Sequence, residues 1–295
     1  MPWDLASDPL ARTIILQLRL PRILLALLAG AVLGAAGFVF QMLFANPLVE
    51  PGFLGVSQGA AFGAALAILL FPPVQAFIQM SSILFALAGL AASYLLARSF
   101  HFGGWILRLI LAGIAVSALF SSGVGLLKYV ADPLSQLPEI TFWLLGSLAG
   151  SSWQRLASVL PVSLISLAML LIFRWRLNIL SLQDRTAFSL GTRPVAEKLL
   201  LLFAATASTA SIISVSGLIG WAGLIVPHLS RKLVSSESRY ALPGSMLLGS
   251  IYLLVSDTFA RTLLTGEIPL GIITSALGAM LFIVILTRAR AGEGL

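Results

Sequence analysis

The chain has 295 residues, of which 59% are hydrophobic and only 10% are charged. A soluble domain carries about 25% charged residues, so the composition excludes an ordinary water-soluble fold and favours a membrane protein. The sequence contains no cysteine, which excludes disulfides, thiolate metal sites and cysteine nucleophiles. The net charge of +7 does not predict a nucleic-acid partner, because the lysines and arginines gather at the ends of apolar runs, where charges usually fix membrane topology.

Nine apolar runs have the length needed to cross a bilayer. A hydrocarbon core of about 30 Å requires roughly 20 helical residues, and lipid allows only helices or closed barrels to span it. The alternating strands of a barrel are absent from the pattern. We therefore predict an all-α polytopic protein with one transmembrane domain over residues 1–295. The predicted spans are 23–44, 53–71, 77–97, 106–128, 156–173, 196–214, 218–233, 242–264 and 269–287.

The basic residues predict an orientation. Most of the 18 lysines and arginines fall in alternate connecting segments, among them 174–198 and the carboxyl-terminal residues. Because cytoplasmic loops carry an excess of lysine and arginine, we expect a cytoplasmic carboxyl terminus. Arg12, Arg19 and Arg22 precede the first span on the opposite side, against the rule, and require a separate reason. The first twenty residues lack the apolar core of a cleavable signal peptide.

Glycines recur at four-residue spacing within the predicted spans, as in Gly30 and Gly34, or Gly55, Gly59 and Gly63. Such faces let membrane helices approach closely. Tight internal packing is the first interpretation, and a passage lined by glycine is the alternative.

Two connecting segments have sequence patterns that predict more than a simple loop. Residues 46–52 (NPLVEPG) place two prolines around Glu50, which breaks any helix. Irregular backbone at membrane depth is tolerated only against protein or a water-filled cavity. Residues 174–198 contain SLQDRTAFSLGTRP, whose mixture of charged and apolar residues predicts one or two short amphipathic helices that lie on lipid or bind a partner.

A few residues suggest chemistry. Gly55 to Gly59 match the G-x-S-x-G pattern, but no strand precedes Ser57. Ser57 and His228 could still form an intramembrane serine hydrolase, which we keep as the alternative function. Asp257 and Arg261 are four residues apart and can pair on one helix. An ion-coupled transporter is disfavoured by the scarcity of intramembrane carboxylates. No phosphate-binding loop is present, so the chain has no evident energy source of its own.

Several longer strings resemble one family in order and spacing. They are RLPRILLALLAGAVLGAAGFVFQ (19–41), NPLVEPGFLGVSQGA (46–60), FWLLGSLAG (142–150), GLIGWAGLIVPHLSRKLV (217–234), SDTFARTLL (256–264) and EIPLGIITSALGAMLF (267–282). The chain thereby resembles the FecCD-type permeases of bacterial type II ABC importers, which carry iron-siderophores, haem, cobalamin or, in some members, molybdate.

The resemblance implies a transport subunit rather than an enzyme, in a bacterial or archaeal cytoplasmic membrane. Two copies would form a homodimer, with two ATPase subunits at the cytoplasmic face and a periplasmic or lipid-anchored binding protein outside. ATP and magnesium would be held by the ATPases, and this chain would bind no cofactor. The substrate would be a metal chelate or a related compound.

The resemblance also implies site residues. Arg19, Arg22 and Arg261 match positions that dock the binding protein, and Asn46 and Leu48 match an inner gate. Trp105 and Ile106 occupy a second gate position, where cobalamin members carry small hydroxyl residues. The positions that match the ATPase-coupling helices are Leu182, Gln183, Asp184, Arg185, Phe188, Leu190 and Gly191. The family norm is ten spans, so the resemblance implies that the first helix is either genuinely missing or lost because the start of the sequence is truncated.

Overall fold

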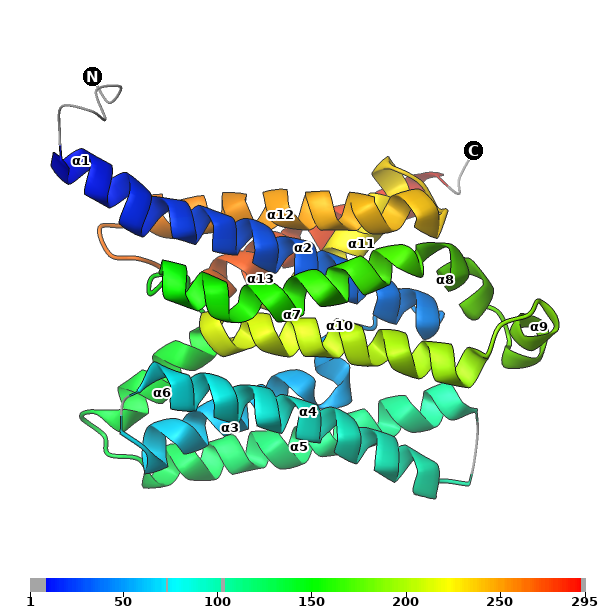
Figure 1. Ribbon diagram of the computed structural model, residues 1–295, viewed down its shortest axis with the longest axis horizontal. Coiled ribbons are helices and arrows are strands. Elements are labelled where there is room, and N and C mark those ends of the chain that lie inside the picture. Colours follow the sequence, from blue (N-terminus) through cyan, green and yellow to red (C-terminus); the bar gives the residue numbers. More distant parts are fainter. Residues whose placement is uncertain (1–8, 73, 102–103, 293–295) are drawn as a thin grey trace.

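The protein is a bundle of helices (Figure 1). The computed structural model describes residues 9–72, 74–101 and 104–292, and this part of the chain contains no β-strand. A π-helical turn, Ile14–Arg19, joins the first two helices, and a 3-10 turn, Pro51–Leu54, precedes α3. The helices are α1 Pro9–Thr13, α2 Leu20–Leu43, α3 Val56–Leu70, α4 Gln75–Ser99, α5 Trp105–Val130, α6 Gln136–Leu145, α7 Trp153–Ile172, α8 Arg174–Leu180, α9 Asp184–Ser189, α10 Pro194–Ser216, α11 Ala222–Leu233, α12 Ser238–Thr262 and α13 Leu270–Gly292.

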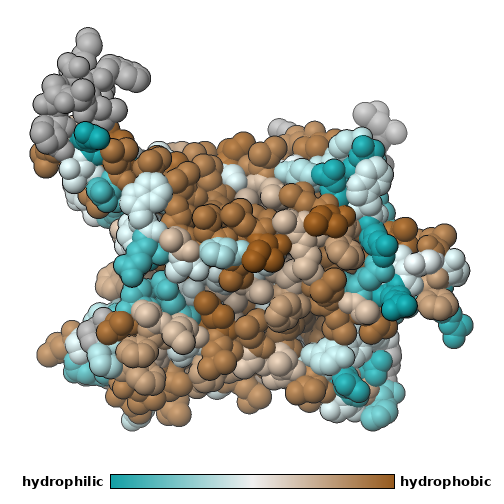
Figure 2. All heavy atoms as spheres, in the orientation of Figure 1, coloured by the Kyte–Doolittle hydropathy of each residue, from teal (hydrophilic) through white to brown (hydrophobic). Residues whose placement is uncertain are grey.

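The long helices run roughly side by side between two ends, which we call the α6 end and the α9 end (Figure 1). Hydrophilic residues gather at both ends, and a broad hydrophobic belt lies between them (Figure 2). Within the described residues, six helices are long and apolar enough to cross a membrane. The all-α polytopic prediction is confirmed, because a bilayer requires this division into belt and ends.

A helix occupies each of the nine predicted positions, but two of these helices are short. α3 has 15 residues and α11 has 12. At 1.5 Å per residue they extend about 22 and 18 Å, less than the hydrocarbon thickness. The predicted span 218–233 begins late because residues 217–221 are irregular, with Gly217 and Trp221 at positive φ. Both short helices therefore start inside the bundle, next to non-helical backbone.

Helix α2 lies at the centre of the bundle. In the 18-residue apolar stretch of the α2 span, 72% of the residues are buried, and in that of α10, 78%. The corresponding share is only 28% in α4 and in α5. A methyl group at Gly30 would overlap the backbone of Gly249, and one at Gly34 would overlap that of Ser245. The four-residue glycine spacing thus brings α2 against α12, which confirms the packing interpretation.

Candidate functional site

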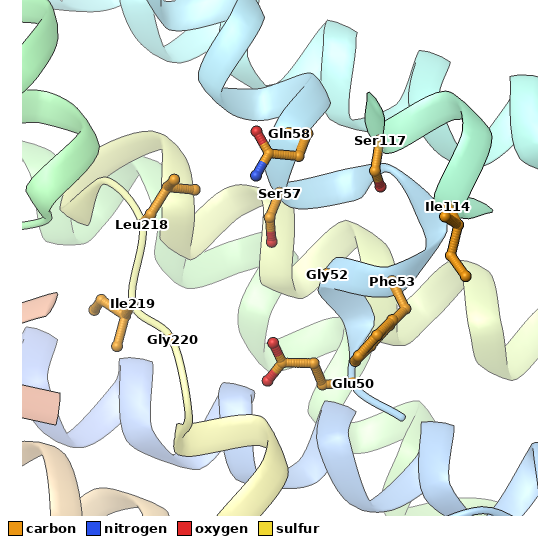
Figure 3. Close-up of a pocket in the computed structure, with 10 residues that line it drawn as sticks. All are labelled: Glu50, Gly52, Phe53, Ser57, Gln58, Ile114, Ser117, Leu218, Ile219 and Gly220. Atoms are coloured by element: carbon orange, nitrogen blue, oxygen red, sulfur yellow. The ribbon is translucent and has the colours of Figure 1, made fainter. Parts of the chain in front are cut away.

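A cavity of about 390 Å³ lies where the irregular segments meet the short helix α3. Its polar side chains come from the 46–55 loop, α3 and α5, and they are Glu50, Ser57, Gln58 and Ser117. The facing wall is apolar and is formed in part by Leu218 and Ile219. Figure 3 shows the Glu50 carboxylate and the Ser57 hydroxyl directed into the same space, opposite the 218–220 segment. The cavity thus places a carboxylate, hydroxyls and an amide opposite an apolar wall inside the bundle.

The loop that carries Glu50 is held in place by local turns. The Asn46 side-chain oxygen accepts a hydrogen bond from the Leu48 amide at 2.9 Å, which forms an Asx turn. Ala45 adopts a left-handed conformation, with φ of 46°, as the chain leaves α2. A Cβ at Gly52 would lie 3.1 Å from Ser57 Oγ and 3.5 Å from Glu50 Oε1. Only glycine at this position leaves the two polar side chains an unobstructed common space.

Side-chain hydrogen bonds connect this loop, and the end of α2 that precedes it, to neighbouring helices. Ser93 Oγ on α4 donates to the Leu54 carbonyl at 2.9 Å. Gln41, at the end of α2, donates to the Leu224 carbonyl at 3.0 Å and accepts from Arg231. These bonds compensate backbone carbonyl groups inside the bundle, so Ser93 connects the loop to α4 and Gln41 connects the end of α2 to α11.

The predicted gate residues fall into two structural classes. Leu48 is 52% exposed and lies in the same loop as Glu50, which lines the cavity. Trp105, at the start of α5, is instead packed, with its ring 5.5 Å from the Tyr94 ring and the Arg108 guanidinium 5.7 Å from its centroid. Ile106 packs against the main apolar core. The gate assignment of all four residues, Asn46 included, stays a prediction.

The three arginines predicted to dock a partner lie at the α6 end, and only one of them is free of ion pairs among the described residues. Arg22 is 9% exposed and contacts Asp257 at 2.9 Å and Glu267 at 2.8 Å. Arg261 contacts the same Asp257 at 3.2 Å, which confirms the predicted pair on α12. Arg19 is exposed. Arg22 thus ties α2 to α12 and to the following loop.

The 174–198 segment forms the two predicted short helices, α8 and α9, and α9 protrudes from the bundle (Figure 1). Apolar side chains on and beside α9 are exposed: Phe188 by 70%, Leu190 by 57% and Leu182 by 44%. Gln183, Arg185 and Gly191 are exposed as well. Asp184 pairs with Lys198 on α10 at 2.7 Å, which ties α9 to the bundle. An exposed cluster of apolar side chains surrounded by charged residues is typical of a protein–protein interface.

The geometry of the cavity does not support the serine hydrolase alternative. Ser57 lines the cavity, but His228 on α11 does not. Among the hydrogen bonds of the described residues none joins these two side chains, and an activated serine requires a base within hydrogen-bond reach.

Comparison with known proteins decides the family. The family model of the FecCD transport family matches residues 3–288. The chain belongs to the FecCD transport family. The molybdate import system permease MolB of Haemophilus influenzae is 42% identical over 98% of this chain and 85% of that protein. The hemin transport permease HmuU of Yersinia pestis is 37% identical, over 98% and 87% respectively.

Solved structures agree with this FecCD assignment. An inward-facing metal-chelate type ABC transporter superposes with a TM-score of 0.91 at 42% identity, covering 96% of this chain and 90% of that one. PsaBC from Streptococcus pneumoniae shares the fold alone, with a TM-score of 0.60 at 18% identity. This FecCD chain is therefore a multi-pass permease subunit of an ABC importer in the cell membrane, not an enzyme, and the hydrolase alternative is set aside.

Sequence reasoning missed several residues of these sites. Gln58 lies within the 46–60 string but was given no role, and Ser117 lies in no motif; the close approach of α3 and α5 brings both to the cavity. Glu267 was read as part of a family string, whereas it is a partner of Arg22. The one available signal was charge balance, because an arginine within an apolar membrane helix requires a nearby carboxylate.

Proposed function

We propose that this FecCD chain works as a homodimer that passes a metal chelate, or a related oxyanion such as molybdate, into the cytoplasm. The α9 end would face the cytoplasm and bind two ATPase subunits, which hold ATP and magnesium. The α6 end would face outward and receive the binding protein. The excess of lysine and arginine at the α9 end supports this orientation, with a cytoplasmic carboxyl terminus.

The observation that carries the proposal is the exposed apolar surface of α9. A 70% exposed Phe188 in water is unfavourable unless a partner covers it, because burying such a side chain contributes roughly 2–3 kcal/mol. α9 is held to α10 by the Asp184–Lys198 pair, so a movement of α9 is transmitted to α10, most of which is buried. Rigid transmission of this kind is what an ATP-driven closure requires.

The Glu50 cavity supports a passage next to the bundle centre. It lies between the loop with Asn46 and Leu48, the half-length helix α3, and the irregular segment before α11. Non-helical backbone at membrane depth is tolerated where it lines a cavity, and broken helices are typical of substrate sites in transporters. In this proposal Leu48 closes the cytoplasmic end of the passage, and Trp105 and Ile106 support the same closure from α5.

Docking of the binding protein is assigned to Arg19 and Arg261, with Arg22 holding both helices in register. Arg261 is 28% exposed in its side chain and Arg22 only 11%. An acidic partner would therefore meet Arg19 and Arg261 directly and reach Arg22 only by displacing Glu267.

The proposal is tested by uptake into vesicles that contain the chain with or without its ATPase. The probes are molybdate, ferric citrate and hemin, each delivered with the cognate binding protein. We expect uptake of one probe only when the ATPase and internal ATP are both present. Equal uptake by vesicles lacking the ATPase would overturn the proposal.

A further inference from the structure

A second polar cavity lies at the α6 end, away from the Glu50 cavity. It has a volume of about 290 Å³ and lies between the first turns of α4 and α7. Apart from one alanine, every residue that lines it is polar: Gln75, Gln79, Ser152, Gln154, Arg155 and Ser158. Its single formal charge is the Arg155 guanidinium. A neighbouring cavity of about 430 Å³ shares Gln75 and Arg155 and continues to Ser216 and Gly217, the residues just before the apolar wall of the Glu50 cavity.

Arg155 has no carboxylate partner among the ion pairs of the described residues, in contrast to Arg22 and Arg261 in the same end of the bundle. Its one side-chain hydrogen bond there goes to the Gln75 side-chain oxygen, at 2.7 Å. Glu139 lines the larger cavity, but it is exposed and does not line the smaller one. A half-buried guanidinium with unused N–H donors therefore faces a cavity that holds no negative charge.

The surrounding groups leave further donors available. Because the Gln75 oxygen accepts from Arg155, its amide N–H groups are free to donate into the cavity. Ser152 Oγ accepts from the Arg155 backbone amide at 3.3 Å, which leaves its hydroxyl proton for another acceptor. α7 begins at Trp153, so the positive end of its dipole lies at the same cavity.

The Arg155 guanidinium packs against Gly150. A Cβ at this position would overlap the Arg155 Nη1 and Cζ atoms, so the planar group lies directly against the glycine backbone. The planar guanidinium fork of an arginine recognises carboxylate and oxyanion oxygens through two parallel N–H donors, and a larger residue at position 150 would displace it from its present position.

We propose that the cavity formed by Gln75, Gln79, Ser152 and Arg155 binds a small anion through its oxygens, either an oxyanion or a carboxylate of a chelate. As a receiving site for anionic cargo it rests on the proposed function, which places the α6 end outside. Binding of the anion depends only on the residues that form this cavity, and it does not depend on which way the bundle is oriented in the membrane.

The test measures binding of molybdate and of citrate to the assembled permease–ATPase complex in nanodiscs of zwitterionic lipid, without binding protein. We expect salt-sensitive binding that Arg155→Gln weakens at least tenfold. Arg155→Lys should retain part of it, because the charge stays and the fork is lost. Gly150→Ala should weaken it severalfold without any change of charge, since the guanidinium must move. Lys128→Gln, which removes a cation from the same end, is the matched control and should bind like the parent.

Thermal unfolding of each variant verifies that it is folded. Equal anion binding by Arg155→Gln and the parent, or equal loss in Lys128→Gln, would overturn the site. Loss of molybdate binding in nanodiscs that contain anionic lipid would assign the cavity to a lipid phosphate and overturn the cargo assignment. A weaker binding-protein complex in Arg155→Gln, with unchanged anion binding, would show a docking contact instead. ATP-driven uptake separates the two proposals: if it persists in Arg155→Gln with unchanged anion binding, the site fails and the transport function stands.

Discussion

The two ends of the bundle differ in how their charged and apolar side chains are paired or covered. At the α6 end, Arg22 and Arg261 share the fully buried Asp257, and Glu267 completes the cluster. At the α9 end, one ion pair holds α9 while Phe188 and Leu190 remain exposed. The ion-pair cluster at the α6 end is formed within the chain, whereas the exposed apolar side chains of α9 have no cover within the described part of the chain. Loss of a charge should therefore affect stability at the α6 end, and loss of an apolar side chain should affect assembly at the α9 end.

The largest effect is expected for Asp257→Asn. Asparagine keeps the size of the side chain but leaves Arg22 and Arg261 without their common carboxylate. Removing one partner of a buried ion pair costs about 3–5 kcal/mol, so the unfolding midpoint in detergent should fall by several degrees or more. Glu267→Gln is the control: its side chain is 44% exposed, and the loss should stay near 1 kcal/mol. Equal destabilisation by both variants would contradict the contrast between buried and exposed partners.

The next effect concerns assembly with the ATPase. Phe188→Ala removes the most exposed apolar side chain of α9, and truncation of an interface anchor costs about 2 kcal/mol, roughly a 30-fold weaker complex. The affinity of the ATPase for the purified permease measures this. Phe203→Ala, on the part of α10 within the apolar belt and 55% exposed, is the matched control and should leave assembly unchanged. If Phe188→Ala assembles normally, α9 is not the contact.

A smaller effect is expected for Arg19→Glu. This exposed cation should attract an acidic binding protein through screened charge, so its reversal should weaken association about tenfold at low salt and much less at high salt. Titration of the binding protein at two salt concentrations measures it, with Lys128→Glu as the charge-matched comparison. A salt-independent change would point to local misfolding instead of electrostatic docking.

The smallest effect is expected for Asp184→Asn, which removes the Lys198 pair at the base of α9. Asp184 is 49% exposed in its side chain, so stability should change by about 1 kcal/mol or less. ATPase activity stimulated by substrate should fall more than ATPase affinity, because the pair transmits force rather than forming the interface. An unchanged ratio of stimulated to basal ATPase activity would show that the pair has no part in transmission.

The sequence predicts helix positions well because apolar length and glycine spacing are local signals. It also predicts the Asp257–Arg261 pair, since four residues on one helix fix the geometry. The late start of α11 could not be predicted, because the irregular backbone at residues 217–221 is stabilised by neighbouring elements such as α6. Helix α6 has only 10 residues and was itself not predicted. The pairing of Arg22 with Asp257 across 235 residues, and the position of Ser117 in the same cavity as Glu50, depend on tertiary packing that no local pattern contains.

The central claim is that this FecCD chain is a passive passage whose movement is driven through α9. The natural sequence has no cysteine, so a single Phe188→Cys substitution gives an unambiguous cross-linking site. We expect this cysteine to cross-link to the ATPase in the assembled transporter, and we expect the cross-link to abolish ATP-driven uptake into vesicles. Absence of any cross-link to the ATPase, while uptake by the same preparation remains normal, would contradict the account.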